Sequence, residues 1–318
     1  MRGGSEEGTT ADRVEPASGP PGRIDARELL DVPPPRGGMA TVRRGGRAFR
    51  VLGCRVTASA RPLPEFLIVG AQRAGTTSLF RALLRHPGVI APVRRKEAHF
   101  FDHRYRSGLS AYRAEFPTSM ARRRREEVIG FAPITGEATP YYLFHPLAPS
   151  RVATSLPDVK IVVMLRDPVT RAYSHYRHSV AWDFEPLSFE DALEAEPHRL
   201  AGEEERIRHR PGYRSFAHQH QSYVARGNYL PQVRRWQEVV PPERMLVLVS
   251  EELFAEPHVN WCRVTSFLGL PEEPLAGLER ANVAAGPPML PETRAALREH
   301  FSPLNEELAQ TLGRSLPW

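Results

Sequence analysis

Residues 65–78 contain the first residues that could bind a reacting group: Gly70 and Gly75, with four residues between them, followed by hydroxyl side chains. Glycine lets the backbone approach an anion closely, and the N–H groups and positive dipole end of a following helix stabilise negative charge. The spacing matches the Walker A frame, but position 76 is threonine where that frame has lysine. The loop is therefore predicted to bind a phosphate or sulfate, and the missing lysine argues against a triphosphate substrate.

A second group of polar residues follows another apolar run, Lys160–Leu165. Arg166 comes directly after it, and Ser174 lies two turns into the predicted helix that follows. Open parallel α/β sheets bind ligands at the carboxyl ends of their strands, where Arg166 is expected. We expect Arg166 and Ser174 to converge on one phosphate, with a structural salt bridge between Arg166 and Asp167 as the alternative.

Apolar periodicity indicates the elements that position these residues. Residues 66–69 form an apolar, β-branched strand, and residues 77–86 form a helix with Leu79, Leu83 and Leu84 inward. Further elements are predicted as strands at 89–91, 128–131 and 245–249, as helices at 188–194 and around Trp261, as an exposed charge-paired helix or loop at 203–210, and as the final helix at Pro291–Leu312.

The two polar groups together resemble the sulfotransferases that use 3′-phosphoadenosine 5′-phosphosulfate (PAPS), particularly the branch of heparan sulfate sulfotransferases and their bacterial relatives. The resemblance covers roughly residues 63–318. It implies an α/β fold, a P-loop-like three-layer sandwich with a central parallel sheet flanked by helices. It also implies PAPS as donor and adenosine 3′,5′-bisphosphate (PAP) as product. Arg166 and Ser174 match the pair that binds the 3′-phosphate. The loop that matches the 5′-phosphosulfate site consists of Gln72, Arg73, Ala74, Gly75, Thr76, Thr77 and Ser78.

Residues 96–102, Lys-Glu-Ala-His-Phe-Phe-Asp, look like the catalytic-base segment of that family, and residues 136–142 look like its substrate-side strand end. The match implies Glu97 as the general base, with a pKa that burial beside two phenylalanines is expected to raise. His99 is the competing base, since histidine titrates nearest neutrality. Its alternative role is to orient Glu97.

Two positions depart from the family pattern. Arg73 stands where the family usually has lysine, and it is expected to stabilise the departing phosphate oxygen. Ala138 stands where glycan-modifying members often carry a second lysine, which weakens the case for a polyanionic glycan as acceptor. The acceptor is therefore left open as a hydroxyl or amine of a glycan, glycolipid or small molecule.

No metal is expected to be needed for sulfuryl transfer. His175 and His178 have a spacing seen in metal sites but lack a third ligand, so both are interpreted as surface or phosphate-proximal side chains. Two rival functions remain. A P-loop small-molecule kinase would use ATP and Mg²⁺, and a non-catalytic anion-binding module would keep the loop without a base.

Composition divides the chain of 318 residues into two parts. Residues 1–62 are rich in Gly, Pro, Arg and Ser and are predicted to form a largely disordered tail, with residues 63–318 as the sulfotransferase domain. No apolar run has the length of a membrane helix and no signal peptide is evident, so a bacterial, cytoplasmic enzyme is expected. Cys54 and Cys262 are expected to be free thiols.

The formal net charge of +6 raises the question of a nucleic-acid partner. Part of the basic excess lies in residues 122–125, four consecutive arginines that are interpreted as a solvated loop. No nucleic-acid-binding motif accompanies them, so no such partner is predicted. Long-range attraction of the anionic donor is an alternative use of the charge.

Overall fold

The computed structural model describes residues 56–281 and 287–318. Its centre is a parallel five-stranded sheet in the order β2-β3-β1-β4-β5. The strands are β1 (Phe66–Gly70), β2 (Val89–Ile90), β3 (Ile134–Ala138), β4 (Lys160–Leu165) and β5 (Met245–Val249). Both neighbours of β1 are parallel to it and all five of its residues are buried, which explains its continuous apolar sequence.

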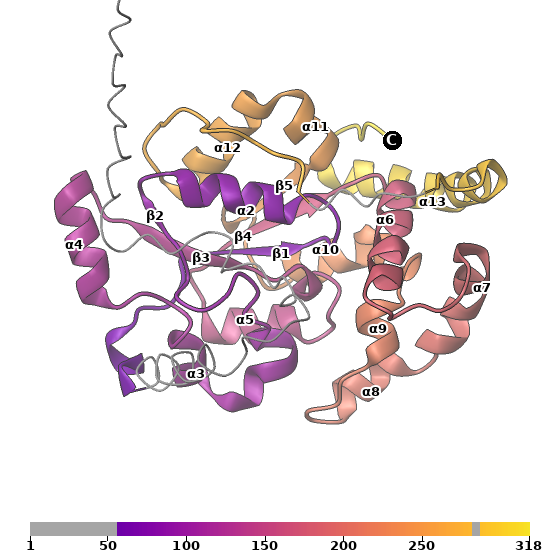
Figure 1. Ribbon diagram of the computed structural model, residues 1–318, viewed down its shortest axis with the longest axis horizontal. Helices are drawn as coiled ribbons and strands as arrows, with labels where there is room; N and C mark the ends of the chain where they lie inside the picture. The colour runs from indigo at the N-terminus through magenta and orange to yellow at the C-terminus, as the bar shows by residue number, and fades with distance from the viewer. Residues whose placement is uncertain (1–55, 282–286) are drawn as a thin grey trace, which may run out of the picture.

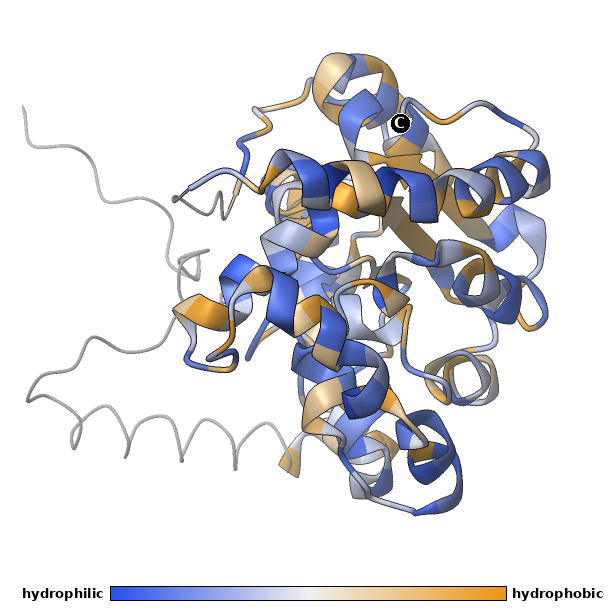
Figure 2. Ribbon diagram, turned by 90° about the vertical axis from the view of Figure 1, so that its right-hand side faces the viewer, coloured by the Kyte–Doolittle hydropathy of each residue, from blue (hydrophilic) through white to orange (hydrophobic). Residues whose placement is uncertain are grey.

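Helices cover both faces of the sheet (Figure 1). On one face lie α2 (Thr76–Arg85), α11 (Ser250–Ala255) and α12 (Pro257–Leu268), and α5 (Ala148–Ser155) lies on the other. The strands are apolar, whereas the surrounding helices mix hydrophobic and hydrophilic residues around their circumference (Figure 2). This arrangement confirms the predicted three-layer α/β sandwich.

A second group of helices lies beside the sheet, where α6 leaves the end of β4 (Figure 1). It consists of α6 (Pro168–Ala181), α7 (Phe189–Leu200), α8 (Glu203–His209) and α9 (Phe216–His220). Its own small core includes Phe189 and Tyr223, to which α13 (Pro291–Leu312) adds Leu297 and Phe301. These helices therefore flank the edge of the sheet at which parallel α/β proteins bind ligands.

The prediction for residues 122–131 is wrong. Instead of a solvated loop and a strand, α4 (Ser119–Ile129) occupies this region. Thr118 caps the helix by accepting a hydrogen bond from Ala121, and Gly130 ends it at a φ of 82°. Arg122 pairs with Glu65 at 2.5 Å. The helix forms because its ends are capped and two of its arginines bind neighbouring loops, Arg122 through Glu65 and the carbonyl of Pro133 and Arg125 through the carbonyl of Pro87.

Apolar periodicity placed this strand too early, because β3 lies at Ile134–Ala138. Its carboxyl end agrees with the strand end that the resemblance implied at residues 136–142. Its sequence is a poor strand pattern because it contains Gly136 and Glu137. A Cβ atom at Gly136 would lie 2.5 Å from the ring of Phe66 on β1, so only glycine fits there. Glu137 is fully buried and accepts a hydrogen bond from the hydroxyl of Tyr112.

Most other elements agree with their predictions. The final helix has the predicted bounds, β2 and β5 are present, and α12 contains Trp261. In α8, Arg206 pairs with Glu203 and Arg208 with Glu204, as a charge-paired helix should. Among the residues described, no helix combines the length and apolarity needed to cross a bilayer.

The described part of the predicted tail packs on the domain. A short helix, η1 (Ala58–Ala60), contains the buried Ala58, and the guanidinium of Arg61 donates to the carbonyl of Phe116. Residues 1–55, including Cys54, lie outside the described residues, whereas Cys262 is an exposed free thiol. The last residues of the predicted tail therefore pack against the domain, so the domain begins before residue 63.

Candidate active site

The predicted anion-binding loop connects β1 to α2. Gly70 packs so closely that a Cβ atom there would lie 2.5 Å from the Cβ of Leu143. Gly75 precedes the first helical residue with a φ of 88°, a conformation that favours glycine. Helix α2 then begins at Thr76, with the side chains of Thr76 and Ser78 buried. The loop therefore ends at the amino end of a helix, a natural position for an anion.

The structure brings Arg73, Arg166 and Ser174 together. The Nε atom of Arg73 donates to Oγ of Ser174 at 3.0 Å, and Nη1 of Arg166 donates to the carbonyl oxygen of Arg73 at 3.0 Å. Burial, and secondly the charge of Arg166, lower the pKa of Arg73 to about 10, so its guanidinium stays charged at neutral pH. Arg166, directly after β4, and Ser174, on α6, thus both contact Arg73 in the loop that follows β1.

Asp167 does not pair with Arg166 in the way that the alternative interpretation required. Its carboxylate caps α6 by accepting from the backbone N–H of Val169 at 3.0 Å. Proline at the first turn of α6 needs no such partner. The carboxylate of Asp167 is thus bound to the backbone of α6, and the guanidinium of Arg166 donates to the carbonyl of Arg73 instead.

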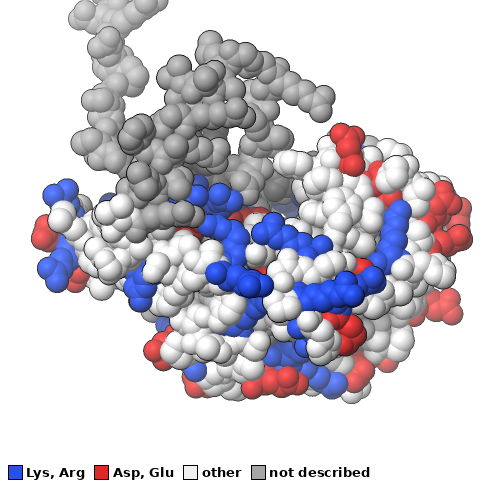
Figure 3. Space-filling model, turned by 90° about the horizontal axis from the view of Figure 1, so that it is seen from below, with Lys and Arg blue, Asp and Glu red and all other residues white. Residues whose placement is uncertain are grey.

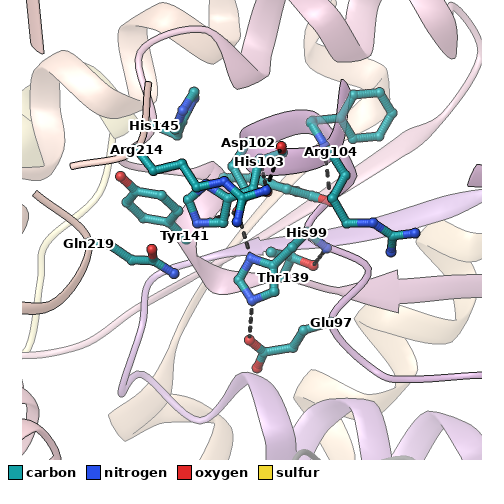
Figure 4. Close-up of polar contacts among 12 residues, drawn as sticks. Glu97, His99, Asp102, His103, Arg104, Thr139, Tyr141, His145, Arg214 and Gln219 are labelled. Atoms are coloured by element: carbon teal, nitrogen blue, oxygen red, sulfur yellow. Dashed lines mark hydrogen bonds and ion pairs between the residues drawn. The ribbon is translucent and has the colours of Figure 1, made fainter. Parts of the chain in front are cut away.

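The carboxylate of Glu97 belongs to a chain of polar contacts that runs through His99 to Asp102 (Figure 4). One of its oxygens accepts from Nζ of Lys96 at 2.9 Å, and the other lies 3.3 Å from Nε2 of His99. The opposite nitrogen of His99, Nδ1, lies 2.6 Å from the buried carboxylate of Asp102. The same Lys96 donates to Oγ1 of Thr77 at 2.8 Å. The base segment and the anion-binding loop are therefore joined by one lysine.

The pKa of Glu97 differs from the expectation. Burial acts to raise it, but Lys96 and His99 outweigh that effect and lower the pKa to about 2. For His99, burial acts to lower the pKa, and the two carboxylates of Asp102 and Glu97 raise it well above its usual value. The predicted rise for Glu97 is wrong because the sequence did not reveal how closely two cations surround the carboxylate.

A buried carboxylate beneath the base segment holds its backbone in place. Glu137, at the end of β3, accepts from the N–H of Ala98 at 2.8 Å and from the hydroxyls of Tyr112 and Tyr142 at 2.8 and 3.1 Å. Burial raises the pKa of Glu137 to about 7 despite these donors. Because Ala98 stands between Glu97 and His99, this anchor fixes the direction of both side chains.

Two of the candidate catalytic residues have a positive φ angle, which is unusual outside glycine. Arg73 and His99 have φ angles of 70° and 48°, and Asp183 is the third non-glycine residue with positive φ among the described residues. Such conformations cost free energy and persist where the surrounding structure requires them. Two of these three residues are candidate catalytic residues.

Three residues of this site were missed as functional candidates. Lys96 and Asp102 were within the quoted base segment, and their place in it was the available signal. Arg226 is fully buried and donates to Oε1 of Gln72 in the loop, and to the backbone of α9. No local pattern could have revealed this contact, because Gln72 and Arg226 are 154 residues apart.

The two histidines of α6 do not share one environment. His175 is fully buried against Tyr223, with ring centroids 5.1 Å apart, and neither of its nitrogens has a hydrogen-bond partner among the described residues. His175 is therefore not a surface side chain, and its proximity to a phosphate stays a prediction. His178, one turn later, is half-buried, and burial, followed by the charge of Arg73, lowers its pKa to about 4.

A different group of residues has the geometry of a metal site. Ligand atoms of His99, Asp102 and His103 all lie within 4.8 Å of one another in the described part of the chain. However, Nδ1 of His99 and the carboxylate of Asp102 already form the 2.6 Å contact with each other. The group is therefore explained by the hydrogen bond between His99 and Asp102, and metal independence stays a prediction.

Charge is distributed unevenly over the surface. On the face seen from below in Figure 3, Lys and Arg side chains gather across the middle and acidic side chains lie mainly toward the margins. A cavity lined by Arg106, Arg151 and Arg214 together with His103 adjoins Asp102. Concentrated positive charge of this kind attracts anionic ligands from a distance.

The fold and the loop after β1 define an α/β protein with an anion-binding site at the carboxyl edge of its sheet. The family model of the sulfotransferase domain matches residues 63–282, and the chain belongs to this family. The matched region is a sulfotransferase domain, and a kinase is not favoured.

Individual relatives agree with this assignment. Heparan sulfate glucosamine 3-O-sulfotransferase 3B1 of Mus musculus is 28% identical over 82% of this chain and 66% of its own length. Heparan sulfate glucosamine 3-O-sulfotransferase 6 of Homo sapiens is 32% identical over 66% of this chain and 53% of its own length. The chain thus spans less than two thirds of either relative. The sulfotransferase of Alicyclobacillus acidocaldarius has 32% identity and a TM-score of 0.58, covering 80% of this chain and 98% of that one.

Proposed function

We propose that the protein transfers a sulfuryl group from PAPS to a hydroxyl or amine of a glycan, glycolipid or small-molecule acceptor, with Glu97 as general base and without a metal. The observation that carries the proposal is the position of Lys96, which contacts both Glu97 and Thr77 of the anion-binding loop. In-line transfer requires the base and the leaving-group site to be near each other, because only the acceptor oxygen and the sulfuryl group lie between them.

The residues present suit the charge of the donor. PAPS, when bound, supplies the sulfuryl group and a phosphate that leaves with the bonding electron pair. Arg73 and the N–H and hydroxyl groups at Thr76, Thr77 and Ser78 supply donors for the departing phosphate oxygen. Arg166 and Ser174 supply donors for the 3′-phosphate. The residue directly after β4 is Arg166 rather than a carboxylate of the Walker B type, and the carboxylate of Asp167 next to it caps α6.

The protonation states favour Glu97 over His99 as the base. A low pKa keeps the carboxylate of Glu97 ionised and able to accept the acceptor's proton. A raised pKa keeps the imidazole of His99 protonated, and a protonated imidazole cannot accept another proton. His99 then orients Glu97 through Nε2 and is itself oriented by Asp102 through Nδ1.

The dependence of activity on pH separates the two candidate bases. If Glu97 is the base, its pKa of about 2 places the acid limb of kcat/KM below pH 4.5, and the rate stays level between pH 5 and pH 7. If His99 is the base, activity rises with pH through a limb above pH 6.5, since the pKa of His99 is raised. Steady-state rates across this range, with stability checked at each pH, distinguish the two.

Replacement of Arg166 tests the nucleotide assignment. Arg166→Ala is expected to weaken PAP binding by on the order of 1.5–3 kcal/mol, as for a charge-assisted contact. Affinity for adenosine 5′-phosphate, which lacks the 3′-phosphate, should change little. Calorimetric titration of both nucleotides measures the difference, and Arg177→Ala on the same helix is the control. An equal loss for both nucleotides would remove Arg166 from the 3′-phosphate site.

The remaining expectations stay predictions within this proposal. They include the cytoplasmic location, the bacterial origin and the absence of a nucleic-acid partner. The two relatives described above act, by their names, on heparan sulfate glucosamine. Ala138 in place of lysine distinguishes this chain at the acceptor side, so a different acceptor class is compatible with the same transfer chemistry.

A further inference from the structure

A group of aromatic rings lies on the surface beyond the candidate active site. Trp182 and Phe216 are 38% and 52% exposed, although large aromatic side chains are normally covered. Phe184 connects them, with ring centroids 6.1 Å from Trp182 and 5.5 Å from Phe216. His178 and His220 complete the group, 5.9 Å from Trp182 and 4.4 Å from Phe184. These five residues are called the aromatic patch.

The patch continues the face of α6 that touches the loop. Ser174, which accepts from Arg73, is followed by His178 four residues later and by Trp182 four residues after that. Residues four apart lie on the same face of a helix. The face of α6 that contacts Arg73 therefore leads directly to the exposed ring of Trp182.

The other side of the patch is connected to the base. Gln219 of α9 lies beside His103, whose ring stacks on His99 with centroids 5.5 Å apart (Figure 4). Phe216 and His220 belong to the same short helix as Gln219. One side of the patch thus leads to Ser174 and Arg73, and the other leads to His103 and His99, so the rings lie beside the candidate active site.

The patch is held in one arrangement by backbone contacts. The hydroxyl of Ser179 donates to the carbonyl of His220 at 2.7 Å, and the side chain of Gln221 donates to the carbonyl of Phe184 at 2.9 Å. Asp183, between the two rings of the turn, has a φ of 58°. A preorganised surface binds a rigid ligand without the entropy cost of ordering side chains.

The rings of the patch are uncharged at neutral pH. Burial, followed by the charge of Arg73 for His178 and of Arg226 for His220, lowers the pKa of each imidazole to about 4. A neutral imidazole offers a flat ring face rather than a positive charge. The patch therefore suits a planar apolar ring, whereas the basic band on the surface suits phosphate or sulfate groups.

We propose that the aromatic patch binds the acceptor, and that the acceptor is a hydroxyl carried on a planar, uncharged aromatic ring. The inference rests on the proposed function, because it names the substrate class of the same site. The aryl oxygen forms the new O–S bond, and its proton passes to Glu97. The bond from sulfur to the donor's 5′-phosphate oxygen breaks, and its electron pair leaves on PAP.

The experiment measures sulfation of 2-naphthol from PAPS by mass spectrometry, with wild type and variants. Trp182→Ala and Phe216→Ala are each expected to lower kcat/KM by about tenfold or more, mainly through KM, because a stacking ring is lost. Trp182→Phe keeps a ring and is expected to retain activity within about threefold. Met120→Ala, at an exposed apolar residue of α4, is the matched control and should equal wild type.

Binding of PAP is measured in parallel to separate two failures. If wild type binds PAP but 2-naphthol is inert while a desulfated heparan polysaccharide is sulfated, the aromatic acceptor is overturned and the proposed function stands. Unchanged kcat/KM in Trp182→Ala would also overturn it. If PAP does not bind, the proposed function falls and this inference falls with it.

Discussion

Replacing Glu97 with glutamine is expected to lower kcat by roughly 10²–10⁴ and to leave PAP affinity nearly intact. Glutamine keeps the size of the side chain and still accepts from Nζ of Lys96, which lies 2.9 Å from the carboxylate. It cannot take a proton from the acceptor. The measurement is a single-turnover rate at saturating PAPS, which separates the chemical step from product release.

His99→Gln is the comparison for this experiment. Since Nε2 of His99 lies 3.3 Å from Glu97 and the pKa of His99 is raised, its loss should misorient the base and reduce the rate less than Glu97→Gln does. A rate for Glu97→Gln close to wild type, together with a severe loss for His99→Gln, would transfer the role of base to the histidine.

Replacing Arg73 with glutamine is expected to lower kcat by roughly 10²–10³, the usual cost of removing one donor from a developing negative charge. Arg73 is the cation inside the loop, and its pKa of about 10 leaves it charged throughout the working range. Because the charge grows on the leaving oxygen during transfer, the loss should fall mainly on kcat rather than on PAPS binding.

Two variants control for the loss of Arg73. Arg73→Lys keeps the cation and is expected to recover much of the rate, since the resembled family usually has lysine here. Arg85→Ala removes an exposed arginine at the other end of α2, which pairs with Glu279 at 2.9 Å, and should have no effect. If Arg73→Gln and Arg73→Lys were equally slow, forked hydrogen bonding rather than charge would be the requirement.

Local patterns in the sequence were sufficient for the loop and its helix. Phe66–Gly70 and the glycine spacing predicted a strand, turn and helix because these features depend on neighbouring residues. The same holds for Pro291–Leu312, where leucine and phenylalanine recur at helical spacing. By contrast, β3 was misplaced because Gly136 and Glu137 are required by tertiary contacts with Phe66 and the base segment.

Electrostatic properties of the site could not be obtained from the sequence. The pKa of Glu97 is lowered by Lys96, its neighbour in the chain, and also by His99, which has a φ of 48° and lies 3.3 Å from the carboxylate. The contact between Gln72 and Arg226 joins segments far apart in the chain. Long-range contacts of this kind decide whether burial or a neighbouring charge dominates.

The most direct test of the central claim is a calorimetric titration of the full chain with PAP in the presence of EDTA. The account predicts that PAP binds without a divalent ion, and that Arg166→Ala reduces this affinity whereas ADP binds weakly with or without Mg²⁺. Tight binding of ADP or ATP that requires Mg²⁺, with no binding of PAP, would contradict it.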